Sequence, residues 1–392
     1  MKVQGFFKDV GGASRVAARR KQVIEQASAK VVARDPINEV ARALHPDAPI
    51  QFTVAEIRDV FPTARTFRLE NENGALPVFQ AGQYVSLLFD VNGVRTCRPY
   101  SISSAPFEAR LEKPFIEITV RRRGETFVPD YLFDEVKPGT KLLGNMPFGQ
   151  FYYEPLRDAK KVVALAGGSG ITPFYSMARE ICFGKLDCEL TILYGSAKSD
   201  DIILKDELDA LHSPKLKVVH VLSDEPDWAG EKGFLSREII SKYSDGDVSY
   251  FICGPQVMYR FLEGELAAMN IPRRRIRREV FGSPRDIAKF PGFPAECADK
   301  SFNITVRRGI HEDVIPARAV ESVVVALERA GIPILTDCRS GSCGYCRSQL
   351  ISGDIFVCPD GDGRRLMDKE LGFFHPCSSY PLSDLTIKIP II

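Results

Sequence analysis

The sequence contains no run of eighteen consecutive apolar residues, so it offers no candidate for a membrane-spanning helix. It has no excess of one charge, because 52 Lys and Arg balance 51 Asp and Glu, which argues against nucleic acid or a membrane surface as a partner. The opening residues, MKVQGFFKDVGG, lack the apolar core of a secretory signal. Only five histidines are present and none forms a Cys-x-His pair, so a Rieske centre is not expected. We therefore expect a cytoplasmic protein without a membrane span.

Cysteine, by contrast, is plentiful, with ten residues in a chain of 392. Disulfide scaffolds are typical of short secreted chains, which this chain does not resemble. Clustered cysteines are therefore expected to bind metal or to carry out redox chemistry. The length favours two or three domains.

Changes in residue pattern divide the chain into five segments. Apolar residues at helical spacing among Lys and Arg predict a helical extension first, which we expect to pack on the next domain or, alternatively, to dock a partner. Short β-rich runs then predict an antiparallel β-barrel, and alternating strands and helices predict a doubly wound α/β sheet. A Pro-rich stretch predicts a flexible linker, and the last segment carries strands, one helix and a cysteine loop. The segments are 1–47 (extension), 48–157 (barrel), 158–283 (α/β), 284–300 (linker) and 301–392 (cysteine-loop domain).

The cysteine loop has the sequence DCRSGSCGYC. Cys338, Cys343 and Cys346 have the Cys-x4-Cys-x2-Cys spacing of the plant-type [2Fe–2S] site. Two irons bridged by two sulfides need four thiolates, so one ligand has to come from elsewhere in the chain.

Two residues compete for the position of the fourth ligand. Cys377 follows Cys346 after thirty intervening residues, whereas Cys358 would leave a return loop of only eleven. We prefer Cys377 for that reason. A zinc site is the alternative, although zinc sites usually use paired Cys-x2-Cys knuckles and this segment has one.

Two parts of the chain resemble known protein families. Residues 301–392 resemble a plant-type ferredoxin, which implies an α+β β-grasp fold. The preceding residues resemble the ferredoxin–NADP⁺ reductase superfamily. Together they resemble the reductase components of oxygenases that carry a C-terminal ferredoxin, and the reductase of hybrid-cluster protein. The resemblance excludes the N-terminal extension.

The segment RPYSIS matches the R-x-Y-S flavin motif of this superfamily. Arg98 is suited to neutralise the flavin pyrophosphate, because its guanidinium presents a fork of donors. The resemblance implies that Tyr100 lies against the flavin ring and that Ser101 has a catalytic role near flavin N5. The expected flavin contacts are Arg98, Pro99, Tyr100 and Ser101. Without the resemblance, this motif indicates only an Arg at the surface and a Tyr ring packed against its neighbours.

The second flavin segment of the superfamily corresponds to GETFVPDYL here. Pro129 stands where a phosphate-binding Ser is expected, which removes a hydroxyl and a backbone donor. The amide of Val128 is the remaining candidate. We expect FAD, with FMN as the alternative.

The segment LAGGSGITP predicts a strand, a glycine turn and a helix. Glycines permit close backbone approach, and the free amides at a helix N-terminus bind a pyrophosphate. We expect Thr172 to cap the helix, with Pro173 as its first residue. The expected nucleotide contacts are Gly167, Gly168, Gly170, Thr172 and Pro173.

Two further markers come from the resemblance. ICGP places Cys253 and Gly254 beside the nicotinamide, with Cys253 orienting the transferring carbon. EVF brings Glu279 and Phe281 to the flavin and nicotinamide, and we expect catalytic roles for Cys253 and Glu279. Without the resemblance, Cys253 is a buried apolar thiol and Phe281 a core residue.

The choice between NADH and NADPH depends on the stretch GSAKSDD after the second α/β strand. Ser196 and Lys198 are able to bind a 2′-phosphate, whereas Asp200 and Asp201 repel it. We favour NADH. The arginine run PRRRIRR, residues 272–278, is either a solvated face or a surface for an acidic partner or for the ferredoxin domain.

These sites predict a reductase. Nicotinamide delivers two electrons together, an iron–sulfur cluster accepts one at a time, and a flavin exchanges electrons with both. We expect electrons to pass from NAD(P)H through flavin and cluster to a separate acceptor protein, either an oxygenase or desaturase or an anaerobic metalloenzyme. The alternative is a non-catalytic electron-transfer subunit that does not oxidise NAD(P)H.

Overall fold

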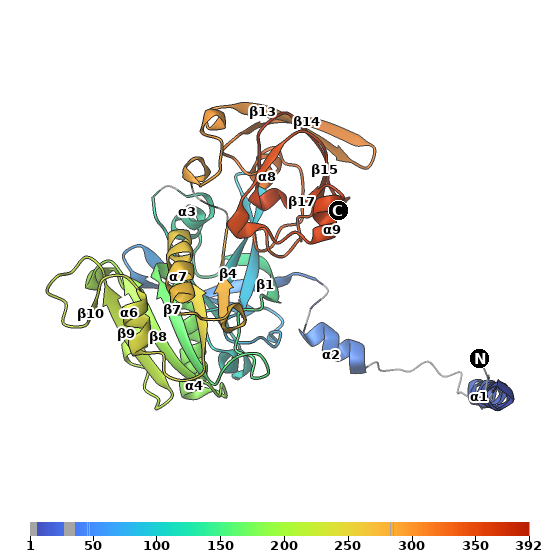
Figure 1. Cartoon of the computed structure of the whole chain (residues 1–392), viewed down its shortest axis with the longest axis horizontal. Helices are drawn as coiled ribbons and strands as arrows, with labels where there is room; N and C mark the ends of the chain where they lie inside the picture. The colour runs from blue at the N-terminus through green and yellow to red at the C-terminus, as the bar shows by residue number, and fades with distance from the viewer. Residues whose placement is uncertain are drawn as a thin grey trace. The chain divides into compact units, whose positions relative to one another are not determined.

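The computed structural model describes residues 6–26, 36–44, 46, 48–124, 126–282, 284 and 286–391 (Figure 1). The chain divides into two units, Met1–Arg42 and Ala43–Ile392. The first unit contains the predicted helix α1 (Phe6–Gln26) and most of the predicted helix α2 (Pro36–Leu44). Their described side chains are exposed, including Val16, Val23 and Ile37. Packing of this extension on the barrel stays a prediction.

The second unit begins with a six-stranded antiparallel sheet in the order β4-β3-β6-β1-β2-β5. An antiparallel bridge between Ile102 and Ile118 joins the chain after β4 to β5, which closes the predicted barrel. Phe52, Phe67 and Leu87 fill its core because alternate side chains of each strand point inward. Its elements are β1 (Ile50–Phe61), β2 (Ala64–Asn71), β3 (Tyr84–Val91), β4 (Val94–Ser101), β5 (Ile116–Arg121), α3 (Phe127–Asp134) and β6 (Lys141–Phe148).

A six-stranded parallel sheet follows, in the order β10-β9-β8-β7-β11-β12, which confirms the doubly wound prediction. Helix α4 packs on one face, and α6 and α7 pack on the other. The strand order reverses between β7 and β11, where open α/β sheets bind ligands at the carboxyl ends of their strands. The elements are β7 (Lys161–Gly167), α4 (Thr172–Phe183), β8 (Glu189–Ser196), α5 (Lys205–Asp209), β9 (Leu216–Leu222), β10 (Glu231–Lys232), α6 (Arg237–Lys242), β11 (Val248–Cys253), α7 (Gln256–Ala268) and β12 (Ile276–Glu279).

The C-terminal domain has a mixed sheet in the order β14-β13-β19-β15-β17, on which α8 packs. A second, two-stranded sheet pairs β16 with β18. This is the expected α+β arrangement. The elements are β13 (Ser301–Arg308), β14 (His311–Arg318), α8 (Val323–Arg329), β15 (Ser348–Ser352), β16 (Ile355–Val357), α9 (Leu366–Glu370), β17 (Phe373–Phe374), β18 (Ser379–Pro381) and β19 (Leu385–Lys388).

The segment before β13 differs from the flexible linker that its composition predicts. Ile287, Phe290 and Phe293 are buried, and they pack with Phe356 and Tyr380 of the C-terminal domain. The Phe293 and Phe356 rings meet edge to face, with centroids 5.4 Å apart. The proline and glycine content of this segment predicted a flexible tether, but the aromatic residues between them pack in a hydrophobic core.

Within the described ranges, no helix combines the length and the apolar character that crossing a bilayer requires.

Candidate functional site

The four predicted cluster ligands come together although they lie on two segments. The Sγ atoms of Cys346 and Cys377 are 3.5 Å apart. The thiol of Cys338 contacts those of both Cys343 and Cys377. Its Sγ also accepts hydrogen bonds of 3.4 Å from the amides of Ser340 and Cys343. All four are free thiols. Their contacts join them into one group, which suits the four thiolate ligands that a binuclear cluster needs.

The competing cysteine lies elsewhere. Cys358 is buried in the small core that also contains Phe293 and Tyr380. It is Cys377, not Cys358, that the fold brings to the loop thiols.

The cysteine loop depends on one glycine. Gly341 has φ of +81°, and a Cβ there would overlap the carbonyl oxygen of Gly361. The amide of Gly363 also donates to the carbonyl of Gly341 over 3.1 Å. The segment before α9 therefore packs directly on the cluster loop.

The flavin motif lies on β4, at the edge of the barrel sheet. Ser101 ends this strand, is buried, and lies opposite Tyr84 of β3. The Tyr84 ring is 5.4 Å from the ring of Phe281, edge to face. Tyr84 also donates a 2.7 Å hydrogen bond to Asp337, the residue before Cys338. The predicted Ser101 and Phe281 therefore meet around Tyr84, a residue that sequence reasoning missed.

The other predicted flavin contacts lie further along the barrel. The Arg98 guanidinium donates to the carbonyl of Cys97 over 2.7 Å, and burial lowers its pKa to about 10. Pro99 lies between Arg98 and Tyr100 on β4, and Tyr100 packs against the barrel core. Val128 is fully buried in the first turn of α3, so only its amide is available to a phosphate.

The glycine turn joins β7 to α4 through a short 3₁₀ turn, Gly168–Ile171. Gly168 has φ of +53°, and a Cβ on Gly170 would overlap the carbonyl of Cys253. Ile171, not Thr172, is the N-cap of α4, because the 3₁₀ turn leads directly into the helix. Thr172 is instead the first helical residue, its hydroxyl donates to the Ser169 carbonyl over 3.1 Å, and Pro173 follows it.

The two remaining markers end neighbouring parallel strands. Cys253 of β11 pairs in register with Glu279 of β12. Burial, reinforced by nearby Glu279, raises the pKa of the Cys253 thiol well above its usual value. Burial first, and then the charges of Cys338 and Asp337, raise the pKa of Glu279 to about 8. Oε2 of Glu279 is buried without a hydrogen-bond partner.

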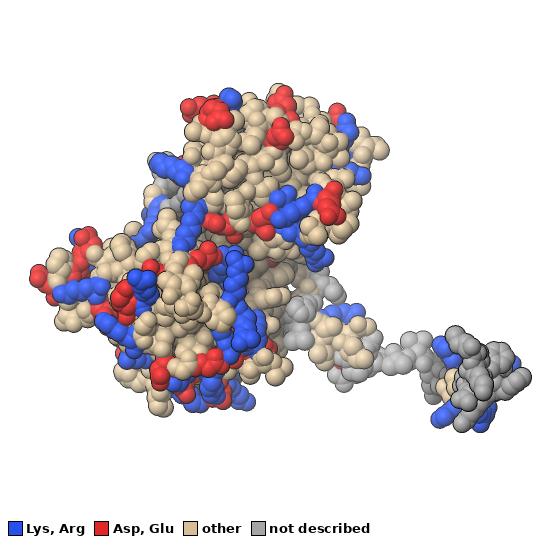
Figure 2. Space-filling model, viewed as in Figure 1, with Lys and Arg blue, Asp and Glu red and all other residues tan. Residues whose placement is uncertain are grey.

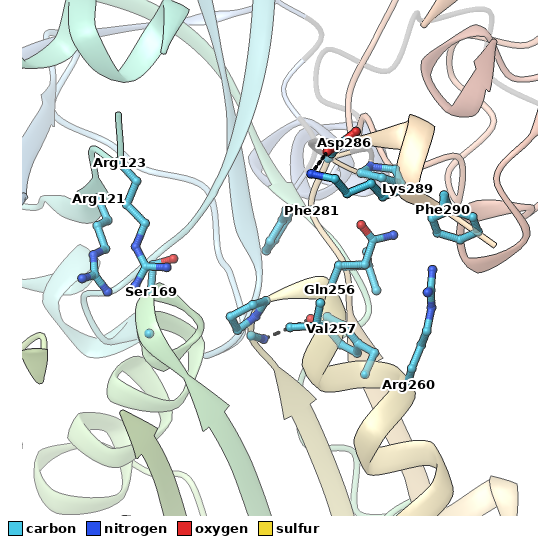
Figure 3. A pocket seen from close by; sticks show the side chains of 17 residues that line it. Arg121, Arg123, Ser169, Gln256, Val257, Arg260, Phe281, Asp286, Lys289 and Phe290 are labelled. Carbon is cyan, nitrogen blue, oxygen red and sulfur yellow. Dashed lines mark hydrogen bonds and ion pairs between the residues drawn. The ribbon is translucent and has the colours of Figure 1, made fainter. Parts of the chain in front are cut away.

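Two cavities open at the carboxyl ends of the parallel strands. One of about 560 Å³ reaches from Gly168 and Gly254 to Phe281 and Phe290 (Figure 3). The other, about 430 Å³, extends from Gly168 past Ser196 and Asp201 to Phe234. Gly168 and Arg123 line both, so the two cavities meet at the glycine turn.

Two arginines that sequence reasoning missed reach this turn from the barrel. Arg121 ends β5, Arg123 follows the strand, and both extend toward Ser169 (Figure 3). Arg121 forms an ion pair with Asp201, and its Nε and Nη1 atoms are buried without hydrogen-bond partners. The run VRRRGE at the end of a barrel strand was the available signal.

A third cavity, about 720 Å³, extends from Tyr84 and Glu279 to the cysteine loop. Tyr84, Phe148 and Glu279 line one part of it, and Cys338 and Cys343 line another.

These residues fit the groups that the sequence predicts. The unpartnered Arg121 nitrogens beside an open glycine turn suit a pyrophosphate. The unpartnered carboxyl of Glu279 near Tyr84 and Phe281 suits a polar ring system placed between them. Four converging thiols with amides directed at sulfur suit a [2Fe–2S] cluster.

Comparison with known families gives three matches in sequence order. An oxidoreductase FAD-binding domain matches residues 51–153, an oxidoreductase NAD-binding domain matches residues 164–264, and a 2Fe–2S iron–sulfur cluster binding domain matches residues 310–382.

Individual proteins are similar over most of the chain. The NADH oxidoreductase HCR of Escherichia coli is 27% identical, over 79% of this chain and 88% of its own length. The heme-dependent oxidative N-demethylase beta subunit of Ectopseudomonas mendocina is 30% identical, over 77% of this chain and 87% of its own. The structure of phthalate dioxygenase reductase superposes with a TM-score of 0.65 at 23% identity, covering 88% of this chain and 98% of that one.

Proposed function

Because this chain belongs to the ferredoxin–NADP reductase superfamily and carries a C-terminal [2Fe–2S] ferredoxin domain, we propose that it is the reductase component of an oxygenase system. It is a flavin-dependent NADH oxidoreductase that supplies a separate redox protein with electrons. When bound, FAD accepts an electron pair from NADH and the cluster forwards single electrons.

The chain's own residues bind and orient these groups. The glycine turn with Gly167, Gly168 and Gly170 supplies amides to the NADH pyrophosphate, and Arg121 and Arg123 neutralise its charge. The Asp201 carboxylate between them repels a 2′-phosphate, which favours NADH.

Residues at the ends of β11 and β12 place the nicotinamide. Cys253 and Gly254 pack closely against the nicotinamide. The uncharged Cys253 thiol orients the nicotinamide and forms no bond to it. Glu279 and Phe281 approach from β12 and the residues after it. Ser101 and Tyr84 lie across from them, and together these side chains exclude water from the reacting atoms.

On β4, Arg98, Pro99 and Tyr100 hold the flavin, and the amide of Val128 is the proposed phosphate donor. Asp130 accepts hydrogen bonds from the amide and hydroxyl of Thr126. A negative charge therefore lies in the same turn of α3 as the Val128 amide. We therefore assign most of the phosphate neutralisation to Arg98.

The iron ligands in this proposal are Cys338, Cys343, Cys346 and Cys377. Their requirement for reduced thiols supports a cytoplasmic location. The proposed domains are 48–157 for flavin, 158–283 for NADH and 301–392 for the cluster.

The third cavity is the observation that carries this proposal. Tyr84, which lies beside Ser101 and Phe281 of the proposed flavin site, lines it together with two of the proposed cluster ligands, which supports a direct path between the two centres. Electron transfer from flavin to cluster then needs no movement of the C-terminal domain.

Anaerobic stopped-flow mixing with NADH tests the function. We expect flavin bleaching first and reduction of the cluster second, the latter detected by electron paramagnetic resonance. A protein that binds flavin and iron but shows no bleaching would instead be a non-catalytic electron-transfer subunit.

A further inference from the structure

One ligand of the proposed cluster differs from the others in exposure. Cys338, Cys346 and Cys377 are 5%, 3% and 2% exposed, whereas Cys343 belongs to the exposed residues. Its neighbour Tyr345 is 52% exposed. Because electron transfer weakens steeply with distance, an acceptor protein has to approach the cluster from the Cys343 side.

Arginines surround this approach. Arg157, Arg277 and Arg278 line the third cavity together with Cys343 and Tyr345. Arg277 and Arg278 come from the α/β domain and Arg157 from the end of the barrel segment, so the arginine run singled out in the sequence faces the cluster loop. The Nε atom of Arg277 is buried and has no hydrogen-bond partner.

Internal carboxylates neutralise only part of this charge. Arg157 and Arg277 share a single partner, Asp158, at 2.9 and 2.8 Å. Arg278 pairs with Glu263. Two arginines therefore have one carboxylate between them, but Glu279 and Asp337 also line this cavity. The excess positive charge therefore comes from the exposed start of the arginine run.

The arginines at the start of the run extend this charge to the surface. Arg273 and Arg274 are exposed, and the described residues provide no ion-pair partner for either. The carbonyl of Arg274 accepts a 2.9 Å hydrogen bond from Arg277, which fixes the turn beside the cavity lining.

The cluster domain presents charges of both signs in the segment 359–370, where acidic residues alternate with Arg and Lys. Arg364 and Lys369 share Asp362, and Arg365 beside them is exposed. Figure 2 shows Lys and Arg side chains, with Asp and Glu among them, on both sides of the boundary between the domain with α7 and the C-terminal domain.

We propose that the acceptor docks with an acidic surface on the arginine-lined mouth of this cavity, and that Tyr345 forms the apolar centre of the contact. This rests on the proposed function, and it adds the docking face and the charge of the partner. One electron leaves the cluster and reduces one acceptor centre, and no bond is made or broken. Charge complementarity governs the rate of encounter and its dependence on salt.

The test uses the holoprotein and two haem proteins of opposite charge. Ferric cytochrome b5, which is acidic, and ferric cytochrome c, which is basic, are titrated into the oxidised protein in a calorimeter. We expect binding of cytochrome b5 at low ionic strength, weakening as salt is added, and no binding of cytochrome c.

The variant Arg273→Glu/Arg274→Glu reverses two charges outside the NADH and flavin sites. We expect its affinity for cytochrome b5 to fall about tenfold, and the rate of cytochrome b5 reduction to fall in parallel. The flavin and cluster should still be reduced by NADH at the wild-type rate.

The matched control is Lys113→Glu/Lys185→Glu, which changes the net charge equally at two exposed lysines outside the described cavities. It should bind cytochrome b5 like the wild type. Equal losses in both double variants, or unchanged binding in the arginine variant, would overturn the docking face. Failure of NADH to reduce the cluster would instead contradict the proposed function, because the calorimetric result does not depend on turnover.

Discussion

At the scale of single residues, the ten cysteines differ in what surrounds them. Cys377 lies 3.5 Å from Cys346, whereas Cys358 packs among aromatic rings. Cys253 is buried beside Glu279, and no other thiol contacts it in the described structure. We therefore expect a cysteine to bind iron, pack in a core or position a substrate, depending on the residues around it.

Replacing a cluster ligand should remove the cluster alone. Ser at Cys338, Cys343, Cys346 or Cys377 should abolish iron binding and leave flavin reduction by NADH intact. The matched control is Cys358→Ser, which should retain the iron. Iron analysis and electron paramagnetic resonance give the answer, and loss of the cluster in the control would reverse the ligand assignment.

Burial should also keep the Cys253 thiol unreactive. Its raised pKa means that it stays protonated, and therefore uncharged, up to a pH above the usual range for cysteine, and only the thiolate is alkylated. Burial raises the pKa of Cys182 too, but its thiol is only half-buried and open to the reagent. Treating the holoprotein with iodoacetamide at pH 8 should therefore label Cys182 slowly and leave Cys253 unlabelled, as judged by peptide mass spectrometry. Rapid labelling of Cys253 would show an activated thiol and contradict a purely positional role.

At the scale of elements, the nucleotide site depends on how closely β7, α4 and β11 approach one another. Gly170 faces the carbonyl of Cys253, and Gly167 faces the sulfur of Met258. No side chain fits between these backbones. The spacing of glycines in the sequence predicted this turn, but not the N-cap, which Ile171 provides instead of Thr172.

A single methyl group should therefore damage this site. Gly170→Ala forces its Cβ onto the Cys253 carbonyl, and we expect a destabilisation of about 1–3 kcal/mol with weaker NADH binding. Gly264→Ala is the control, because the space around Gly264 in α7 is open and alanine should stabilise that helix by about 0.5–1 kcal/mol. Thermal unfolding and NADH titration distinguish the two, and equal effects would show that Gly170 is not in close contact.

At the scale of the whole second unit, the cluster domain is held on the barrel by buried polar contacts. Thr96 donates a 2.9 Å hydrogen bond to Glu328 of α8, and Glu328 pairs with Arg339 of the cluster loop. Both side chains of this pair are 8% exposed. Together with the contact between Tyr84 and Asp337, this arrangement keeps the cluster loop at the flavin site.

Breaking the buried pair should separate the two redox steps. Glu328→Ala removes the carboxylate that pairs with the buried Arg339 guanidinium, at a cost of about 3–5 kcal/mol. We expect normal flavin bleaching by NADH but slower cluster reduction in stopped-flow experiments. Glu312→Ala removes an exposed ion pair with Arg307 in the same domain and should cost less than about 1 kcal/mol. Unchanged cluster reduction in Glu328→Ala would show that the contact does not hold the domain in place.

The sequence by itself determined the features that depend on local spacing. Three loop thiols, the glycine turn and the alternation of strands and helices could be read from it, because each is set by residues close together in the chain. The sequence also favoured Cys377 over Cys358, and the fold brings Cys377 to the loop thiols. Only the tertiary structure decided that Arg121 and Arg123 reach the glycine turn from another domain, and that residues 286–297 pack rather than tether. These features depend on contacts between residues far apart in sequence, and the folded core, not the local pattern, selects such contacts.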